Sequence, residues 1–210
     1  MRTSTRSVVL LAAVVVLTTA PALRAEISPE PVDLGDQKRQ KLDDGEILVD
    51  VEQEGALHTD VIAVVDAPID EVWEAIDDYN TQKEWVPDMM SNSKLLERHD
   101  DYKICRSGND LPWPIANRVY NLKVRNSQKK VDGVDSYVSV YEFVEGSGNI
   151  EEMDGYWLLQ PFEGDDDRTL VRQYTKIDLG ISVPQSFIRS GTQKRLPGLI
   201  KGLRDYLARH

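Results

Sequence analysis

The sequence has very little of the residue types that cross-link a fold or bind a metal. Its 210 residues include one cysteine, Cys105, and three histidines, His58, His99 and His210. A single cysteine cannot form an intramolecular disulfide, so the hydrophobic core must hold the fold. The histidines lie far apart in the chain and show no metal-ligand or Ser-His-Asp spacing. We therefore expect no metal, no cofactor and no catalytic residue.

Basic residues are also scarce relative to acidic ones. Lys and Arg number 25 against 36 Asp and Glu, which gives a net charge of −11. Affinity for nucleic acid comes mainly from neutralising phosphates, so we expect no nucleic-acid partner. The same excess of acid argues against strong static docking on anionic lipid and leaves only transient membrane contact as an expectation.

No apolar run reaches the ~20 residues that span a bilayer. The main run, residues 8–17, is preceded by two arginines and followed by small residues, a pattern typical of a secretory signal peptide. We predict that residues 1–25 are a signal peptide cleaved after Ala22 or Ala25, and that the mature chain is periplasmic. An uncleaved membrane anchor is the alternative.

The rest of the chain is expected to be a short arm and one domain. Residues 26–44 are rich in Pro, Asp, Gln and Lys without periodicity, which predicts a weakly structured arm before a domain at 45–210. Pro68 opens a short helix with an apolar stripe. Alternating or β-branched residues predict strands at 47–52, 59–65, 93–98, 102–107, 117–125, 136–144, 156–161 and 170–179. Hairpin-length connections then favour an antiparallel α+β fold.

The last thirty residues predict a long amphipathic helix, which must bury its apolar stripe against the sheet. Pro197 lies inside this helix and should kink it. Three glycines, Gly191, Gly198 and Gly202, flank the stripe, although each costs ~1 kcal/mol relative to Ala in a helix. Either the helix packs closely against its neighbours there, or the missing side chains leave room for a ligand.

Four segments resemble START-type lipid-transfer domains, in the order in which that family has them. They are VVDAPIDEVWEAIDDYNTQKEWVPDMMSNSKLLE at 64–97, LPWPIANRVYNLKV at 111–124, the hairpin segment at 156–188 and LPGLIKGLRDYL at 196–207. The wider helix-grip superfamily includes birch-pollen-type allergens, polyketide cyclases and coenzyme Q-binding proteins. The resemblance implies a curved antiparallel sheet of about seven or eight strands wrapped around the C-terminal helix. It also implies a bacterial exported protein that carries a lipid in an internal cavity without covalent chemistry.

One position departs from the family pattern. The Arg-Asp pair that follows the P-W-P loop is Arg118-Val119 here, so the cation is kept and the carboxylate is missing. Arg118 then either pairs with another acid in a structural role or faces the mouth of the cavity.

The resemblance and the inward strand faces together give a set of cavity residues, in which the loops of Trp85 and Trp113 form the rim. The set is Trp85, Trp113, Arg118, Tyr120, Leu122, Tyr141, Phe143, Tyr174, Phe187, Ile188, Gly191, Leu196, Leu199, Gly202 and Leu203. We expect a monomer that binds a lipid or another hydrophobic small molecule. Two rivals stay open: a cyclase- or aromatase-like enzyme with a polar pair deep in the cavity, and an interaction module whose filled core leaves less than roughly 300 Å³.

Overall fold

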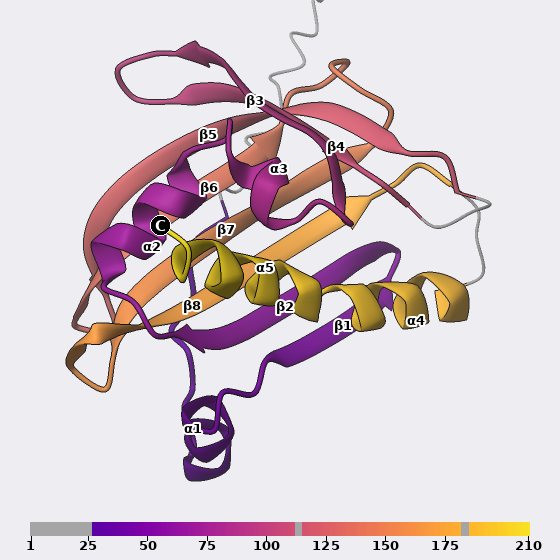
Figure 1. The fold of residues 1–210 in the computed structure, drawn as a ribbon. Helices are drawn as coiled ribbons and strands as arrows, with labels where there is room; N and C mark the ends of the chain where they lie inside the picture. The colour runs from indigo at the N-terminus through magenta and orange to yellow at the C-terminus, as the bar shows by residue number, and fades with distance from the viewer. Residues whose placement is uncertain (1–26, 112–114, 182–184) are drawn as a thin grey trace, which may run out of the picture.

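The computed structural model describes residues 27–111, 115–181 and 185–210, apart from the side chains of residues 54 and 185–187. Within these residues, eight strands form one antiparallel sheet in the order β1-β2-β8-β7-β6-β5-β4-β3 (Figure 1). The strands are β1 (Leu48–Glu54), β2 (Ala56–Val65), β3 (Met90–Arg98), β4 (Lys103–Asn109), β5 (Arg118–Val131), β6 (Val134–Phe143), β7 (Glu152–Phe162) and β8 (Asp165–Asp178). The helices are α1 (Asp36–Asp43), α2 (Ile69–Asp77), α3 (Gln82–Trp85), α4 (Gln185–Arg195) and α5 (Pro197–Leu207).

Two tight turns set the register of the four central strands. Asp132 and Gly133, between β5 and β6, have φ of 52° and 78°, and Glu163 and Gly164, between β7 and β8, have φ of 55° and 78°. Two-residue turns with left-handed backbone match the right-handed twist of the flanking strands. The strands can therefore pair from the turn outward over long stretches and curve as one surface.

The C-terminal helices lie across the concave face of this sheet, and α2 and α3 cover the rest of that face (Figure 1). Helix α4 ends at Arg195 and α5 begins at Pro197. The proline ring has no N–H to donate to the preceding turn, which interrupts the hydrogen-bond ladder. The predicted break at Pro197 is confirmed, and the wall that the helices form has two segments.

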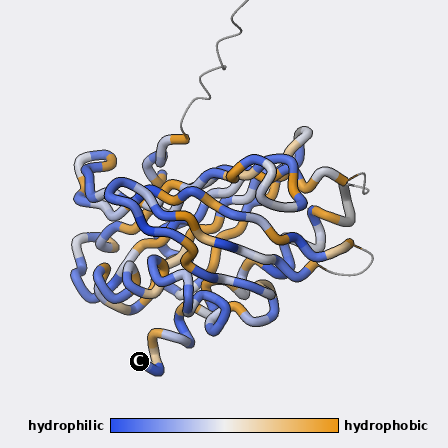
Figure 2. The backbone as a smooth tube through the Cα atoms, turned by 90° about the horizontal axis from the view of Figure 1, so that it is seen from above, coloured by the Kyte–Doolittle hydropathy of each residue, from blue (hydrophilic) through white to orange (hydrophobic). Residues whose placement is uncertain are grey.

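The main core fills the space between these helices and the concave face. Val72 and Ile76 of α2 and Ile200 and Leu203 of α5 are buried there against inward strand residues such as Leu159. Hydrophobic residues lie mainly in the middle of the molecule, while the outer loops are mostly hydrophilic (Figure 2). The amphipathic stripe of the C-terminal helices therefore packs as the sequence predicts.

The N-terminal arm covers the convex face of the sheet. Ile27 and Val32 pack against a buried cluster made by Val138, Tyr156 and Leu158, whose side chains point away from the concave core. Hydrophobic burial on both faces stabilises the middle of the sheet, because each face removes apolar area from water at about 25 cal/mol per Å². The expectation of a weakly structured arm is therefore wrong for this segment.

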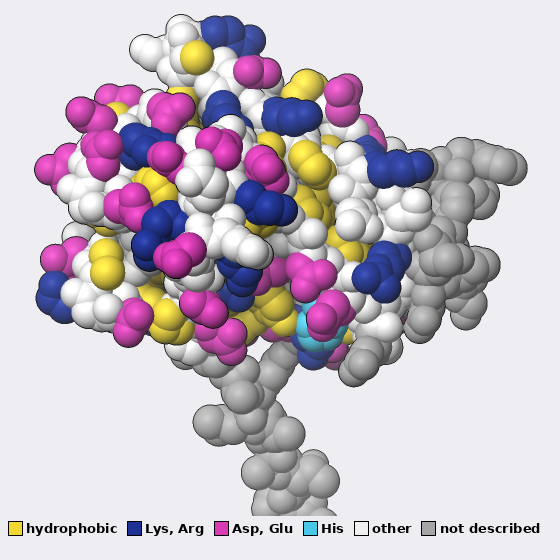
Figure 3. All heavy atoms as spheres, turned by 90° about the horizontal axis from the view of Figure 1, so that it is seen from below, with side chains coloured by type: hydrophobic (Ala, Val, Ile, Leu, Met, Phe, Trp, Pro, Cys, Tyr) yellow, Lys and Arg dark blue, Asp and Glu magenta, His cyan; other side chains and the backbone are white. Residues whose placement is uncertain are grey.

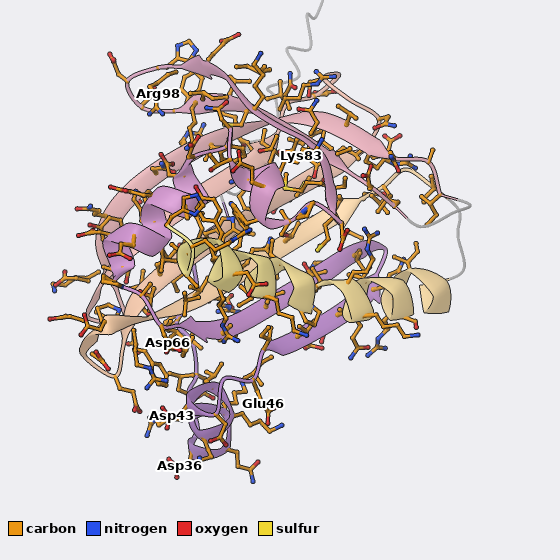
Figure 4. The ribbon with its side chains drawn as sticks, in the orientation of Figure 1. Asp36, Asp43, Glu46, Asp66, Lys83 and Arg98 are labelled. Carbon is orange, nitrogen blue, oxygen red and sulfur yellow. The ribbon has the colours of Figure 1, made fainter. Side chains whose placement is uncertain are left out.

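Helix α1 is the second part of that correction. It buries Leu42 completely against a cluster on β2, β7 and β8. Arg168 of β8 links the helix to the start of α2, since its side chain pairs with Asp43 at 2.8 Å and with Asp66 at 3.2 Å (Figure 4). The sequence pattern missed α1 because a single buried leucine gives no periodicity.

The predicted α+β fold with eight strands and a short helix after the second strand is confirmed. Helix α3 lies where a loop was expected.

None of the described helices is long and apolar enough to cross a bilayer. On the face shown in Figure 3, acidic and basic side chains are interspersed and no large patch of one sign forms. Within the described ranges, no three His, Cys, Asp or Glu residues gather in a way that could hold a metal ion.

Candidate ligand-binding cavity

A cavity of about 230 Å³ lies between the concave face of the sheet, helix α4 and the first turn of α5. Most of its wall is apolar. The apolar side chains come from strands, from the segment after α3 and from the C-terminal helices, and they include Leu57, Val86, Met89, Met90, Leu122, Met153, Trp157, Ile177, Leu179, Ile188, Leu196 and Leu199. A cleft or cavity with a mostly apolar wall and a few polar groups is the usual form of a small-molecule site.

The strand period places polar groups in this wall. Arg118, Tyr120 and Leu122 alternate along β5 and all face the cavity, because successive side chains of a strand point to opposite faces. On β8 the same rule brings Gln173 and Thr175 inward. Polar residues on two separate strands thus converge on one apolar space.

Tyr141 is the centre of a buried hydrogen-bond network on the floor of the cavity. Its hydroxyl lies 2.7 Å from Thr175 Oγ1, receives a hydrogen bond from Gln173 Nε2 at 2.7 Å and donates to the Tyr174 carbonyl at 3.0 Å. Gly155 makes this position possible, since a Cβ there would lie 2.6 Å from the tyrosine hydroxyl. The network holds the Gln173 amide in place.

That amide has one unused end. Gln173 is 8% exposed, and its Oε1 has no hydrogen-bond partner among the described residues. A buried acceptor without a partner costs about 1–3 kcal/mol, so most such groups in proteins find one. A ligand that donates a hydrogen bond from within the cavity would satisfy it.

The buried tyrosines of the wall are neutral donors. Burial raises the pKa of Tyr79, Tyr120 and Tyr141 above the ordinary value of 10.0. Tyr120 donates its hydroxyl hydrogen to Asn109 Oδ1 at 2.9 Å. These groups can bind polar atoms of a ligand, but they are too weakly acidic to serve as bases near neutral pH.

Two arginines line one end of the cavity. Arg118 is 6% exposed and donates from Nη1 to the Ala116 carbonyl at 2.8 Å, while its Nε has no partner among the described residues. Arg195, at the end of α4, donates to the carbonyls of Asp110 and Asp88. The Asp110 carboxylate lines the same cavity and accepts a hydrogen bond from Asn117 Nδ2 at 2.5 Å.

The structure brings part of the predicted site together. Eight of the predicted residues line the cavity: Arg118, Tyr120, Leu122, Tyr141, Ile188, Gly191, Leu196 and Leu199. The side chains of Trp113 and Phe187 lie outside the described residues. The wall also contains polar groups that the sequence interpretation missed, namely Thr59, Gln82, Ser107, Asn109, Gln173 and Thr175.

Five other predicted residues are not in the wall. Tyr174 points to the convex face, where its ring stacks on Tyr156 at 5.5 Å, so its inward assignment is wrong. Phe143 packs at the edge of the main core, and Trp85 and Leu203 are buried inside that core. These side chains support the cavity from behind and do not border it.

The remaining one, Gly202, answers the question raised by the glycines. A Cβ at Gly202 would overlap the main-chain carbonyl oxygen of Trp85, so this glycine is a close-packing site between α5 and α3. A Cβ at Gly191 would meet nothing within 4 Å, and Gly191 borders the cavity. Only Gly191 leaves open space, while Gly198 is exposed near the sulfur of Met89.

Solved structures share this arrangement. A STAR-related lipid transfer protein from Xanthomonas axonopodis is 26% identical over 77% of this chain and 93% of its own, with a TM-score of 0.64. The chain is a START/helix-grip domain. Human StAR-related lipid transfer protein 5 superposes with a TM-score of 0.62 at 12% identity over 77% of this chain and 86% of its own. The ZhuI aromatase/cyclase from Streptomyces sp. R1128 gives 0.56 at 16% identity over 72% and 93%.

Among the neighbours of this START/helix-grip domain are thus both lipid transfer proteins and an aromatase/cyclase. No family model and no curated protein matches the sequence. Because proteins with different activities share the fold, function has to be argued from the cavity itself.

Proposed function

We propose that this protein binds a hydrophobic small molecule in the cavity and carries it between membranes. The observation that carries the proposal is the mostly apolar cavity wall between α4 and the sheet, which includes the unpaired Nε of Arg118 and Oε1 of Gln173. Burial of the apolar part of the ligand would supply the driving force. Support also comes from the neighbours that are lipid transfer proteins by name.

The size of the cavity limits what it holds without rearrangement. Its volume of about 230 Å³ falls below the ~300 Å³ at the lower end of ligand pockets, which taken alone favours the interaction module with a filled core. The unpaired polar atoms favour a ligand-binding protein. In an interaction module with a filled core, Arg118 Nε and Gln173 Oε1 would have no hydrogen-bond partner in any state, whereas a ligand could supply one. A longer ligand would require α4 to move away from the sheet.

Native mass spectrometry of the purified protein, followed by organic extraction, tests this proposal. A co-purifying hydrophobic molecule that competes with added lipid is the expected result. Gly191→Leu should reduce binding by filling the open space, whereas Ser190→Leu places the same side chain at an exposed position of α4 and should not. A protein that never carries or takes up a hydrophobic molecule would overturn the proposal.

We also propose that the chain is exported and works as a monomer in the periplasm, touching membranes only transiently. The support is the signal-peptide pattern of residues 1–25 and the net charge of −11. The intact mass of the protein from the soluble periplasmic fraction tests it: a chain starting after Ala22 or Ala25 is expected. A full-length chain in the membrane fraction would favour the anchored alternative.

A cyclase-like enzyme is the second candidate, because one carboxylate, that of Asp110, borders the cavity beside Arg118 and Tyr120. The aromatase/cyclase among the structural neighbours also supports it. Acid–base work needs a proton donor or acceptor within reach of the ligand, and Asp110 is the acidic residue in position for this role. If the protein converts a linear polyketide substrate and Asp110→Asn abolishes this turnover, the protein is an enzyme. Binding of the substrate without turnover would favour the carrier function.

A further inference from the structure

The buried cations of this acidic protein differ in whether a carboxylate neutralises them. Away from the cavity, buried Arg172 pairs with Asp60 at 2.7 Å and buried Lys103 pairs with Asp77, while half-buried Arg204 donates to the main-chain carbonyls of Val64 and Gly45. The two cavity arginines are also held by main-chain carbonyls, and Arg118 is the one of the two that is buried. With 36 acidic residues in the chain, a carboxylate partner was available in composition but is not placed there.

Arg118 is the sharper case. Among the described residues, no carboxylate oxygen lies within 4.0 Å of its guanidinium, and its only hydrogen bond goes to Ala116. A buried charge without a partner is strongly unfavourable in the free protein. A neutral side-chain donor could make the same hydrogen bond to the Ala116 carbonyl. Among the described residues, nothing therefore requires the positive charge of Arg118.

The second arginine lies at the same end of the cavity. Arg118 lies opposite Asn109 in the β4–β5 pairing. The residue that follows Asn109 is Asp110, whose main-chain carbonyl accepts a hydrogen bond from Arg195 at 2.7 Å. The Asp110 carboxylate accepts a hydrogen bond from the Asn117 side chain. Two positive charges thus face one negative charge around the polar end of an apolar space.

We propose that the ligand is an anionic amphiphile, whose carboxylate or phosphate group binds Arg118 with support from Arg195 while its apolar part lies against the wall. The inference rests on the proposed function and adds the chemical class of the ligand. Guanidinium groups bind both kinds of anion through paired N–H donors, and the free Nε–H of Arg118 is such a donor. The anion would supply the counter-charge that the chain does not.

A matched set of ligands tests the proposal on the full mature chain. Decanoate, decyl phosphate and decanol share one chain and differ in the head group, and inorganic phosphate has the head group alone. Titration calorimetry at pH 7 should show decanoate or decyl phosphate binding at least tenfold more tightly than decanol. The stronger of the two identifies the head group, and inorganic phosphate should bind far more weakly than decyl phosphate.

Variants of the arginine then assign the preference. Arg118→Met should abolish the tenfold preference and leave decanol affinity unchanged, whereas Arg118→Lys should keep part of it. Arg98→Met removes the same charge at the end of β3, far from the cavity (Figure 4), and should change nothing. Because Arg118→Met replaces an unpaired buried charge with apolar volume, the variant should melt at the same or a higher temperature. If it does not fold, Arg195→Met should show a reduced preference instead.

The outcomes separate this inference from the function on which it rests. Equal affinity of the wild type for decanol and the anions would overturn the inference and leave the carrier function standing. Binding of none of the amphiphiles would overturn both. If inorganic phosphate binds as tightly as decyl phosphate, the site binds a free anion and the proposal of an amphiphilic ligand is wrong. If Arg118→Met keeps the preference for anions, Arg118 is not the residue that binds the head group.

Discussion

Two buried arginines show how the faces of the sheet differ. Arg172 on the convex face is 9% exposed, and Arg118 on the concave face is 6% exposed. The first binds Asp60 through Nε and Nη2 and also donates to the carbonyls of Glu30 and Pro31 in the N-terminal arm. The second has one carbonyl. Arg172 is thus neutralised within the chain and contributes to stability, while Arg118 keeps hydrogen-bonding capacity that the described chain does not use.

Strand β8 shows the same contrast within four residues. Arg172 and Tyr174 point to the convex face, where Tyr174 accepts or donates a hydrogen bond with His58 Nδ1 at 2.8 Å and stacks on Tyr156. Gln173 and Thr175 point to the cavity, where the Gln173 amide has an unpaired oxygen. Changes on alternate residues of one strand should therefore affect stability and binding separately.

The largest expected effect breaks the pair on the convex face. Asp60→Asn leaves Arg172 buried without its counter-charge, which should lower the free energy of unfolding by about 3 kcal/mol. The control Asp166→Asn removes the same charge from the exposed start of β8 and should cost less than about 0.5 kcal/mol. Urea unfolding followed by circular dichroism measures both. Equal midpoints for the two variants would show that the convex pair contributes nothing to stability.

The two glycines of the C-terminal helices should respond in opposite directions. Gly202→Ala pushes a methyl group into the Trp85 carbonyl and should destabilise the fold by about 2 kcal/mol, as overpacking does. Gly191→Ala meets open space and should stabilise α4 by up to about 1 kcal/mol. Thermal melts of the pair test this, and a neutral Gly202→Ala would mean that α5 can shift away from α3 at little cost.

A smaller effect is expected for the unpaired amide. Gln173→Met removes two hydrogen bonds to Tyr141 and Thr175 together with one unsatisfied atom, so stability should change by less than about 1 kcal/mol. Binding of a ligand that carries a hydroxyl should weaken about tenfold, which corresponds to one lost hydrogen bond of about 1.4 kcal/mol. Calorimetry with 10-hydroxydecanoate and decanoate measures the difference. Equal losses for the two ligands would contradict a hydrogen bond to Gln173.

The cavity-facing side chains of a strand could be predicted from the sequence only where the opposite face of that strand is polar. On β5, polar and apolar residues alternate clearly, and the inward positions of Arg118, Tyr120 and Leu122 followed from the period. On β8, residues 170–173 are all buried because the arm covers the outer face, so the alternation disappears. The inward placement of Tyr174 failed for that reason, since nothing local reveals that a distant segment seals the convex face.

The cavity itself shows the same limit. The helical stripe and the break at Pro197 follow from spacing and from the missing N–H. Which glycine packs and which one borders open space depends on the approach of α3 to α5, and these elements are more than 100 residues apart. The polar network of Tyr141, Gln173 and Thr175 joins β6 and β8, which lie on either side of β7 in the sheet and are brought together only by the strand order.

The last prediction concerns opening of the cavity, and it sharpens the comparison by placing one thiol reporter on each face of the sheet. Cys105 is fully buried on β4, two residues before the cavity-lining Ser107. Burial raises the pKa of its thiol to about 12, so at pH 8 the group is protonated and a labelling reagent reaches it only when the concave side opens. Val138→Cys in a Cys105→Ala background places a thiol in the buried cluster of the convex face.

If the break at Pro197 lets α4 move when a ligand enters, Cys105 should react with a thiol reagent at least tenfold faster than the thiol in Val138→Cys. Saturating decanoate should slow the reaction of Cys105 and leave the convex reporter unchanged, because a ligand in the cavity stabilises only the closed concave side. Pro197→Ala, which restores the missing helix donor, should also slow it. Equal rates for both reporters, matching the rate of global unfolding, would mean that the two faces open together and that the helix break is not a hinge.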